Sequence, residues 1–273
     1  MNIRKAERKQ AKIKMAIMGP SGSGKTYSSL LIAKGLCGSF DKVCIIDTEN
    51  GSSDLYANLG SYSTIAISTP YAPEKYIQAI EMAETEGMEV IILDSISHCW
   101  EYLIDYHSGM LGNSFTNWSK ITPRHNALFT KILSSKLHII ATLRVKQDYV
   151  LAEKNGKMVP EKIGLKAIQR NGVDYEFTLV FDLNIRHQAS CSKDRTGLFI
   201  NSPEFTLGES TGDSIRQWCT GTEDIASRIQ SAKSLKELLE IYKTNGNEDL
   251  LKLFTERKTI LTNQLKINEN GKY

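Results

Sequence analysis

The sequence lacks any apolar run that approaches the roughly 20 residues a membrane-spanning helix requires. Its opening residues, MNIRKAERKQAKIK, also lack the apolar centre of a secretory signal peptide. We therefore expect a cytoplasmic protein with no membrane partner. The composition agrees with a soluble globular chain, because 41% of the residues are hydrophobic and 24% are charged.

Metal-binding and disulfide patterns are absent as well. The five cysteines contain no C-x-x-C pair, and the five histidines contain no H-E-x-x-H. Neither a disulfide framework nor a zinc site is expected. The sequence shows no internal repeat and no low-complexity tract.

The charge is close to balanced, with a net value of +3, but it is unevenly placed. Residues 1–14 carry six basic side chains and one acidic side chain. We take residues 1–13 as a basic N-terminal arm. Such an arm can contact phosphates, or it can be a solvated leader.

Apolar runs and amphipathic segments alternate through most of the chain. Unbroken apolar runs near 14–18, 42–47, 89–94 and 137–143 are separated by helix-length segments. This pattern predicts an α/β core, residues 14–220, with a mostly parallel sheet flanked by helices. Asn155-Gly156 predicts a hairpin at 148–163, and two further strands should meet at a turn around 193–197. Residues 221–273 predict a small helical C-terminal appendage of two or three helices.

The stretch GPSGSGKT matches the P-loop pattern G-x-x-x-x-G-K-[ST], between an apolar strand and a helix. Its glycines let backbone N–H groups turn toward phosphate oxygens, and the helix N-terminus adds a positive end. Lys25 should reach the outer phosphates and Thr26 should offer its hydroxyl to Mg²⁺. The predicted cofactors are therefore ATP and Mg²⁺, with a nucleotide-binding segment made of Gly19, Pro20, Ser21, Gly22, Ser23, Gly24, Lys25, Thr26 and Tyr27.

Acidic residues follow two other predicted strands. Asp94 ends VIILD and should hold Mg²⁺, while Asp47 and Glu49 end KVCIIDTEN. Ligands of an open parallel sheet gather at the carboxyl ends of its strands, so these acids should share one edge with the P-loop. We predict Glu49 as the catalytic base and Asp47 as its support. The alternative is that both acids cap neighbouring N–H groups.

The motifs GPSGSGKT, IIDTEN, IILDS and IIATLRVK resemble the RecA core in order and spacing. In that family the glutamate after the P-loop helix and its strand is catalytic, and it falls on Glu49. HIIATLRVKQDYV, KIGLKAIQRNGVDYEF and SKDRTGLF further resemble phage-encoded nucleotide-binding proteins of RecA-core type that accompany recombination genes. The likeness covers about residues 12–205. It implies the host cytoplasm if the protein is phage-encoded.

The resemblance also implies residues outside the P-loop. RecA recombinases end the fourth strand with a glutamine that senses the γ-phosphate, whereas this chain has Arg144 near that position. The positive Arg144 is the catalytic-site candidate that could sense the phosphate instead. Lys193 and Arg195 form a K-x-R pair that resembles the finger of hexameric RecA-core ATPases such as KaiC. The alternative is two solvated charges in a turn. Real fingers would imply a homo-oligomeric ring or filament.

RecA cores bind single-stranded DNA with loops after the third and fourth strands, here about 108–122 and 145–172. The first of these two segments contains Phe115 as well as Trp118 and Lys120. Basic residues with aromatic platforms suit sequence-tolerant binding of single strands. The DNA-binding candidates are Lys146, Lys154, Lys157, Lys162, Lys166, Arg170, Trp118 and Lys120.

The leading interpretation is a Mg²⁺-dependent, DNA-stimulated ATPase of RecA-core type that acts on single-stranded DNA in phage recombination or annealing. A phage annealing or single-strand binding protein would be a further partner. One alternative is a KaiC-like signalling or scaffolding NTPase that does not touch DNA. The other is a P-loop small-molecule kinase, which should carry an arginine-rich lid.

Overall fold

The computed structural model describes residues 11–154, 157–220, 225–245 and 250–270. The chain divides into two compact units. One is Ala11–Arg216, and the described residues from Gln217 onward belong to the other. Most of the predicted basic arm lies outside the described residues.

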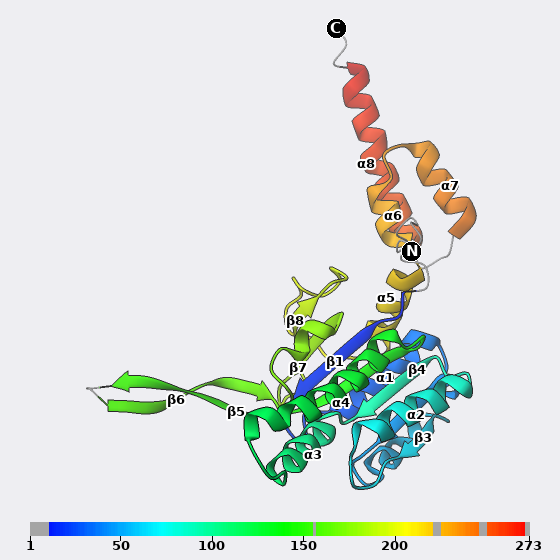
Figure 1. Cartoon of the computed structure of the whole chain (residues 1–273). Coiled ribbons are helices and arrows are strands. Elements are labelled where there is room, and N and C mark those ends of the chain that lie inside the picture. The colour runs from blue at the N-terminus through cyan, green and yellow to red at the C-terminus, as the bar shows by residue number, and fades with distance from the viewer. Residues whose placement is uncertain (1–10, 155–156, 221–224, 246–249, 271–273) are drawn as a thin grey trace, which may run out of the picture. The chain divides into compact units, whose positions relative to one another are not determined.

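The larger unit is built on a mixed sheet with the order β3-β2-β4-β5-β1-β7-β8 (Figure 1). The strands from β3 to β7 pair in parallel, and β8 closes one edge in antiparallel. The expected α/β core with a mostly parallel sheet is therefore confirmed. The strands are β1 (Lys14–Gly19), β2 (Val43–Asp47), β3 (Ser63–Ala66), β4 (Val90–Asp94), β5 (His138–Lys154), β6 (Lys157–Ala167), β7 (Leu179–Leu183) and β8 (Ala189–Asp194).

Helices cover both faces of this sheet. The helices of the chain are α1 (Lys25–Cys37), α2 (Pro73–Thr85), α3 (Ser97–Ser108), α4 (Ser114–Ser134), α5 (Glu209–Thr220), α6 (Ile225–Ser231), α7 (Leu235–Asn245) and α8 (Leu251–Asn270), with short 3-10 turns at Phe40–Lys42, Ser52–Leu59 and Val173–Glu176. Among them, no described helix is long and apolar enough to cross a membrane.

The main core lies between the sheet and α2, α3 and α4. Alternate strand residues, including Ile46, Leu93 and Leu143, join helix residues such as Tyr76 and Ile132 in one buried cluster. Because successive side chains of a strand point to opposite faces, the intervening strand residues face the side that α1 covers. The core strands are buried on both faces, as a parallel sheet requires.

β5 continues beyond the sheet and forms a hairpin with β6. Past Arg144 it pairs with β6, in an antiparallel register from Val145 opposite Ala167 to Lys154 opposite Lys157. The predicted hairpin is confirmed, although Asn155-Gly156 lies outside the described residues. The ribbon leaves the sheet next to α3 (Figure 1).

One helix boundary expected from the sequence is wrong. The helix-length segment before the apolar run at 137–143 was expected near 123–135, but α4 begins at Ser114 and passes through Pro123. The Asn113 carboxamide oxygen caps it by accepting from Phe115 N at 2.8 Å, so most of the predicted loop 108–122 is helix. Strand β3 was not predicted, because its four residues lie at an edge and none is fully buried.

The turn between the last two strands was also misplaced. β7 and β8 are joined at residues 184–188, not around 193–197. The Asp194 carboxylate instead organises the later turn, accepting hydrogen bonds from the backbone N–H groups of Thr196 and Phe199 at 2.6 and 2.7 Å. The chain therefore leaves the sheet after Asp194.

The smaller unit contains α6, α7 and α8, so the expected group of small helices is present. Their shared core consists of Ile229, Ala232, Leu238, Ile241, Phe254 and Leu261.

Helices α1 and α5 meet at a pair of glycines. A Cβ added at Gly212 would overlap the backbone oxygen of Ile32, and one at Gly35 would overlap that of Glu209. We expect Gly212→Ala to destabilise the larger unit by about 1–3 kcal/mol, since backbone cannot move aside as a flexible side chain can. Thermal unfolding should show a Tm lowered by several degrees. The matched control is Gly208→Ala, where a Cβ meets nothing within 4 Å. Equal Tm values for the two variants would contradict this close approach.

Candidate nucleotide-binding site

The loop between β1 and α1 has the conformation of a phosphate cradle. Gly22 and Gly24 have φ angles of 75° and 86°, values that L-residues with side chains rarely adopt. α1 begins at Lys25, so its free N–H groups and positive end face the loop. A Cβ at Gly19 would lie 2.9 Å from the Leu183 carbonyl oxygen, so glycine is also required by close packing.

Lys25 folds back onto its own loop. Its Nζ donates to the carbonyl oxygens of Gly19 and Pro20 at 2.9 and 2.8 Å. Burial lowers the pKa of this ammonium group from its ordinary value, opposed by the nearby Asp94 carboxylate. In a nucleotide complex, the outer phosphates would replace these two carbonyl oxygens as the hydrogen-bond partners of the Lys25 ammonium group.

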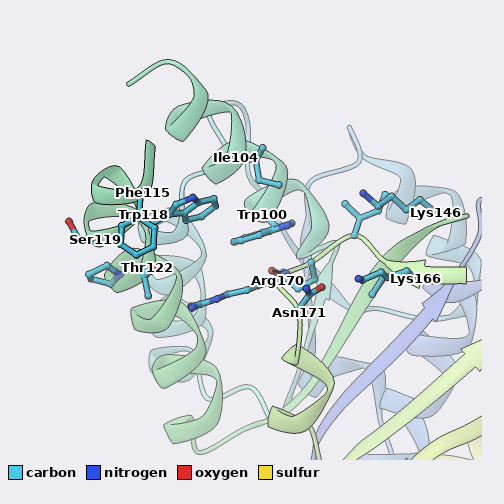
Figure 2. Close-up of a pocket in the computed structure, with 14 residues that line it drawn as sticks. Trp100, Ile104, Phe115, Trp118, Ser119, Thr122, Lys146, Lys166, Arg170 and Asn171 are labelled. Carbon is cyan, nitrogen blue, oxygen red and sulfur yellow. Dashed lines mark hydrogen bonds between the residues drawn. The ribbon is translucent and has the colours of Figure 1, made fainter. Parts of the chain in front are cut away.

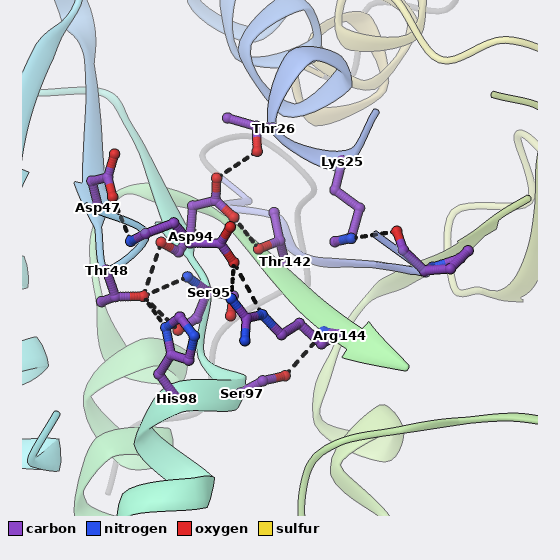
Figure 3. A network of polar contacts seen from close by, with 12 residues as sticks. Lys25, Thr26, Asp47, Thr48, Asp94, Ser95, Ser97, His98, Thr142 and Arg144 are labelled. Atoms are coloured by element: carbon purple, nitrogen blue, oxygen red, sulfur yellow. Dashed lines mark hydrogen bonds and ion pairs between the residues drawn. The ribbon is translucent and has the colours of Figure 1, made fainter. Parts of the chain in front are cut away.

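Asp94 joins the P-loop helix to the central strands (Figure 3). Its Oδ2 accepts from the Thr26 hydroxyl at 2.6 Å, and its Oδ1 accepts from the Thr142 hydroxyl at 2.5 Å. The side chain is buried, and that burial raises its pKa from the ordinary value. A hydroxyl and a carboxylate beside a phosphate cradle fit Mg²⁺, which takes few protein ligands and completes its shell with phosphates and water.

Asp47 supports the turn after β2. Its Oδ1 accepts from Glu49 N at 2.6 Å, and its Oδ2 accepts from the backbone N–H and hydroxyl of Ser53 at 3.0 and 2.6 Å. The capping alternative therefore describes Asp47. Next to it, the Thr48 hydroxyl accepts from Ser95 N at 2.9 Å and ties β2 to the exit of β4.

Glu49 instead points to Arg144. Its Oε1 accepts from Arg144 Nε and Nη2 at 3.1 and 3.0 Å. The two side chains are 29% and 41% exposed, so the pair lies at the surface of the site and can be reached by a ligand. The structure thus places both residues at the same strand edge as the P-loop.

These groups line one open cavity of about 490 Å³. The P-loop contributes Ser21, Gly22, Gly24, Lys25 and Thr26 to its lining, and the other lining residues are Glu49, Ser52, Leu55, Tyr56, Asp94, Arg144, Val145 and Ile168. Of the other predicted loop residues, Ser23 is fully buried.

Sequence reasoning missed Tyr56, whose ring lies 5.7 Å from that of Tyr27. The sequence signal that could have indicated Tyr56 is an aromatic residue in the segment that follows Glu49. Tyr27 is 42% exposed. The two rings offer an aromatic surface beside the cradle.

Comparison with known proteins agrees with this site. Residues 11–211 match a protein-family model described as an AAA domain. The chain belongs to this AAA domain family. The expectation of a P-loop NTPase is therefore confirmed, whereas phage origin and recombination stay predictions.

No curated protein sequence matches the chain. Among solved structures, a KaiC-like protein from the hyperthermophilic archaeon Pyrococcus horikoshii is similar, with 16% sequence identity and a TM-score of 0.43. The match covers 72% of this chain and 86% of that chain.

A second cavity of this AAA domain, of about 980 Å³, lies between α3, α4 and the base of the β5–β6 hairpin (Figure 2). We call it the aromatic–basic groove. It is lined by Trp100, Ile104, Phe115, Trp118, Ser119, Thr122, Pro123, Lys146, Lys166, Ala167, Ile168, Gln169, Arg170 and Asn171.

The groove brings together residues that were predicted separately. Phe115 and Trp118 come from the first predicted DNA segment, and Lys146, Lys166 and Arg170 come from the second. Lys120 is not among the lining residues. The side chains of Lys154, Lys157 and Lys162 lie outside the described residues.

The aromatic wall is a stack of rings. Trp118 stacks on His107 at 4.2 Å between centroids and faces Trp100 at 6.0 Å. Trp100 in turn meets the edge of His125 at 5.3 Å. Trp100 was not predicted, because it lies on α3, outside the segment 108–122 that was expected to contact DNA.

The groove and the nucleotide cavity adjoin each other at Ile168, which lines both. Ile168 N donates to the Arg144 carbonyl oxygen at 2.8 Å, while Arg144 N donates to the Ser97 hydroxyl at 3.0 Å. Arg144 is therefore held between the first turn of α3 and the segment that forms the groove.

Lys193 and Arg195 lie at the opposite edge of the sheet. β7 runs parallel to β1, and Asp194 pairs with Leu179 at the start of β7. Lys193 Nζ donates to the carbonyl oxygens of Asp174 and Tyr175 at 2.8 and 2.7 Å, and Arg195 Nη2 donates to Tyr175 O at 3.1 Å. The length of β7 therefore lies between these two side chains and the P-loop of the same subunit.

Proposed function

We propose that the chain is a Mg²⁺-dependent ATPase that acts on single-stranded DNA. The observation that carries this proposal is the shared strand edge. There, a phosphate cradle with a nearby glutamate adjoins a groove of tryptophans and cations.

The cradle accounts for binding of the triphosphate. Lys25 exchanges the carbonyl oxygens of Gly19 and Pro20 for phosphate oxygens, and the N-terminus of α1 adds its positive end. Thr26 and Asp94 are the residues that would hold Mg²⁺, which neutralises charge on the phosphates when it is bound. The aromatic rings of Tyr27 and Tyr56 offer contacts for a base.

Glu49 supplies the base for hydrolysis. It accepts the proton of the water that attacks the terminal phosphorus, as the P–O bond to the leaving diphosphate breaks. In this structure Arg144 neutralises the carboxylate through two hydrogen bonds to one oxygen. A bound γ-phosphate would compete with Glu49 for the same guanidinium. The position of Arg144 would then depend on whether the γ-phosphate is present.

The aromatic–basic groove supports binding of single strands. Trp100, Trp118 and Phe115 offer faces on which unpaired bases stack, and Lys146, Lys166 and Arg170 offer charge to phosphates. Phe115 is 84% exposed, so its ring is accessible to an unpaired base. Duplex DNA shields its base faces, so the stacking surfaces favour single strands.

The finer parts of the proposal extend beyond one subunit. A homo-oligomer would let Lys193 and Arg195 contact a neighbour's nucleotide. Action in phage recombination or annealing, with an annealing or single-strand binding protein as partner, rests on the resemblance of the motifs.

Substitution of Glu49 separates chemistry from binding. We expect Glu49→Gln to keep Mg·ATP affinity within a few fold while hydrolysis falls roughly 10²–10⁴-fold, the weight of a general base. The control Lys25→Ala should lose most nucleotide binding as well as turnover. Both are measured by binding of a fluorescent ATP analogue and by steady-state phosphate release. If Glu49→Gln lost binding and rate to the same extent, Glu49 would have a structural role.

Substitution of Trp118 tests the groove. We expect Trp118→Ala to weaken binding of a fluorescent oligo-dT by roughly 5–150-fold, because base–aromatic stacking contributes about 1–3 kcal/mol per base. Fluorescence anisotropy at several salt concentrations should also show a salt-sensitive wild-type affinity. Leu111→Ala is the control, since Leu111 is 97% exposed on the α3–α4 connection but does not line the groove. Equal, salt-insensitive binding by all proteins would contradict the DNA part of the proposal.

Mixing two inactive variants tests the fingers. An Arg195→Ala subunit keeps its own Glu49, and a Glu49→Gln subunit still offers Arg195 to its neighbour. Their mixture should recover part of the wild-type phosphate release, rising with protein concentration, because a composite site forms only on assembly. Absence of rescue where mixed oligomers are present, shown by cross-linking of differently labelled subunits, would exclude action in trans.

A further inference from the structure

The turn that joins β7 and β8 lies against the P-loop. β7 is parallel to β1, with Asp182 opposite Met18, so residues 184–188 emerge at the edge where the P-loop begins. At this edge the backbone of Leu183 closely approaches Gly19. No sequence motif pointed to this turn.

His187 occupies a strained position in the turn. Its φ of 61° is in the left-handed region, which is unfavourable for a residue with a side chain. The conformation is held by the Asn184 side chain, whose Oδ1 accepts from the backbone N–H groups of Arg186 and Gln188 at 2.8 and 3.1 Å. Strain that the surrounding structure maintains is frequently found at functional positions.

The strained backbone brings the His187 ring onto the cradle. Nδ1 of His187 lies 3.0 Å from the carbonyl oxygen of Ser23. A carbonyl oxygen only accepts, so Nδ1 carries the proton and donates it. The neighbouring Gly24 leaves room for the ring, since a Cβ there would lie 3.1 Å from Nδ1.

We infer that His187 is a positioning residue for the phosphates of the nucleotide. The peptide between Ser23 and Gly24 is planar and trans, so its C=O and N–H point in opposite directions. By holding the Ser23 carbonyl outward, His187 turns the Gly24 N–H to the other side, where Gly24 lines the nucleotide cavity. The hydrogen bond also polarises the peptide and strengthens that N–H as a donor. This inference rests on the proposed nucleotide-binding function of the P-loop.

Two substitutions separate the donor from the backbone strain. His187→Asn keeps a donor nitrogen the same number of bonds from Cβ, and asparagine tolerates the left-handed region. His187→Gly relieves the strain but removes the donor. Binding of a fluorescent Mg·ATP analogue, KM and kcat for ATP, and the Tm without nucleotide are measured for both variants of the full chain.

We expect His187→Gly to weaken binding and raise KM by about 3–10-fold, the effect of one lost hydrogen bond, with little change in kcat. His187→Asn should stay within about twofold of the wild type. The Tm of His187→Gly should not fall, so the loss cannot be assigned to unfolding. Wild-type affinity in His187→Gly, or an equal loss in His187→Asn, would overturn the inference. If Lys25→Ala also binds like the wild type, the P-loop itself is not the site and the proposed function fails as well.

Discussion

The buried carboxylate of Asp94 is the interaction on which the site depends. It ends the central strand β4 and accepts hydroxyl hydrogen bonds from Thr26 on α1 and Thr142 on β5. A carboxylate taken from water is costly unless polar partners surround it. Asp94 therefore fixes the start of the P-loop helix relative to the sheet. The other groups of the site are carried by this helix and by the ends of the neighbouring strands.

Parallel pairing of β2 and β5 with β4 places further residues of the site beside Asp94. Asp47 lies directly opposite Asp94 in the register of β2 and β4, so the turn that follows β2 begins beside the P-loop. Both carboxylate oxygens of Asp47 accept hydrogen bonds from that turn. Glu49, by contrast, lines the cavity. From the other side β5 delivers Arg144, whose backbone is bonded to Ser97 and Ile168. One guanidinium thus stands between the carboxylate proposed for catalysis and the segment that forms the aromatic–basic groove.

The sequence predicted the parts of this arrangement that depend on strand exits. Buried apolar runs that end in Gly19, Asp47 and Asp94 predict their common edge, because parallel strands leave a sheet in the same direction. Contacts that depend on tertiary packing were not predictable. The start of α4 at Ser114 is set by the Asn113 cap, whereas the helix was expected to begin near residue 123. Trp100 and His187 showed no local sequence signal. Their proposed roles depend on contacts with residues distant in the sequence, Trp118 and Ser23 respectively.

The most direct measurement is a structure determined with Mg²⁺ and a non-hydrolysable ATP analogue. We expect the Lys25 ammonium to have left the carbonyl oxygens of Gly19 and Pro20 for the outer phosphates. Thr26 and Asp94 should lie beside the metal, and Arg144 should be shared between Glu49 and the γ-phosphate. An analogue bound elsewhere, or a Lys25 still held by its own loop beside a bound nucleotide, would contradict the proposed site.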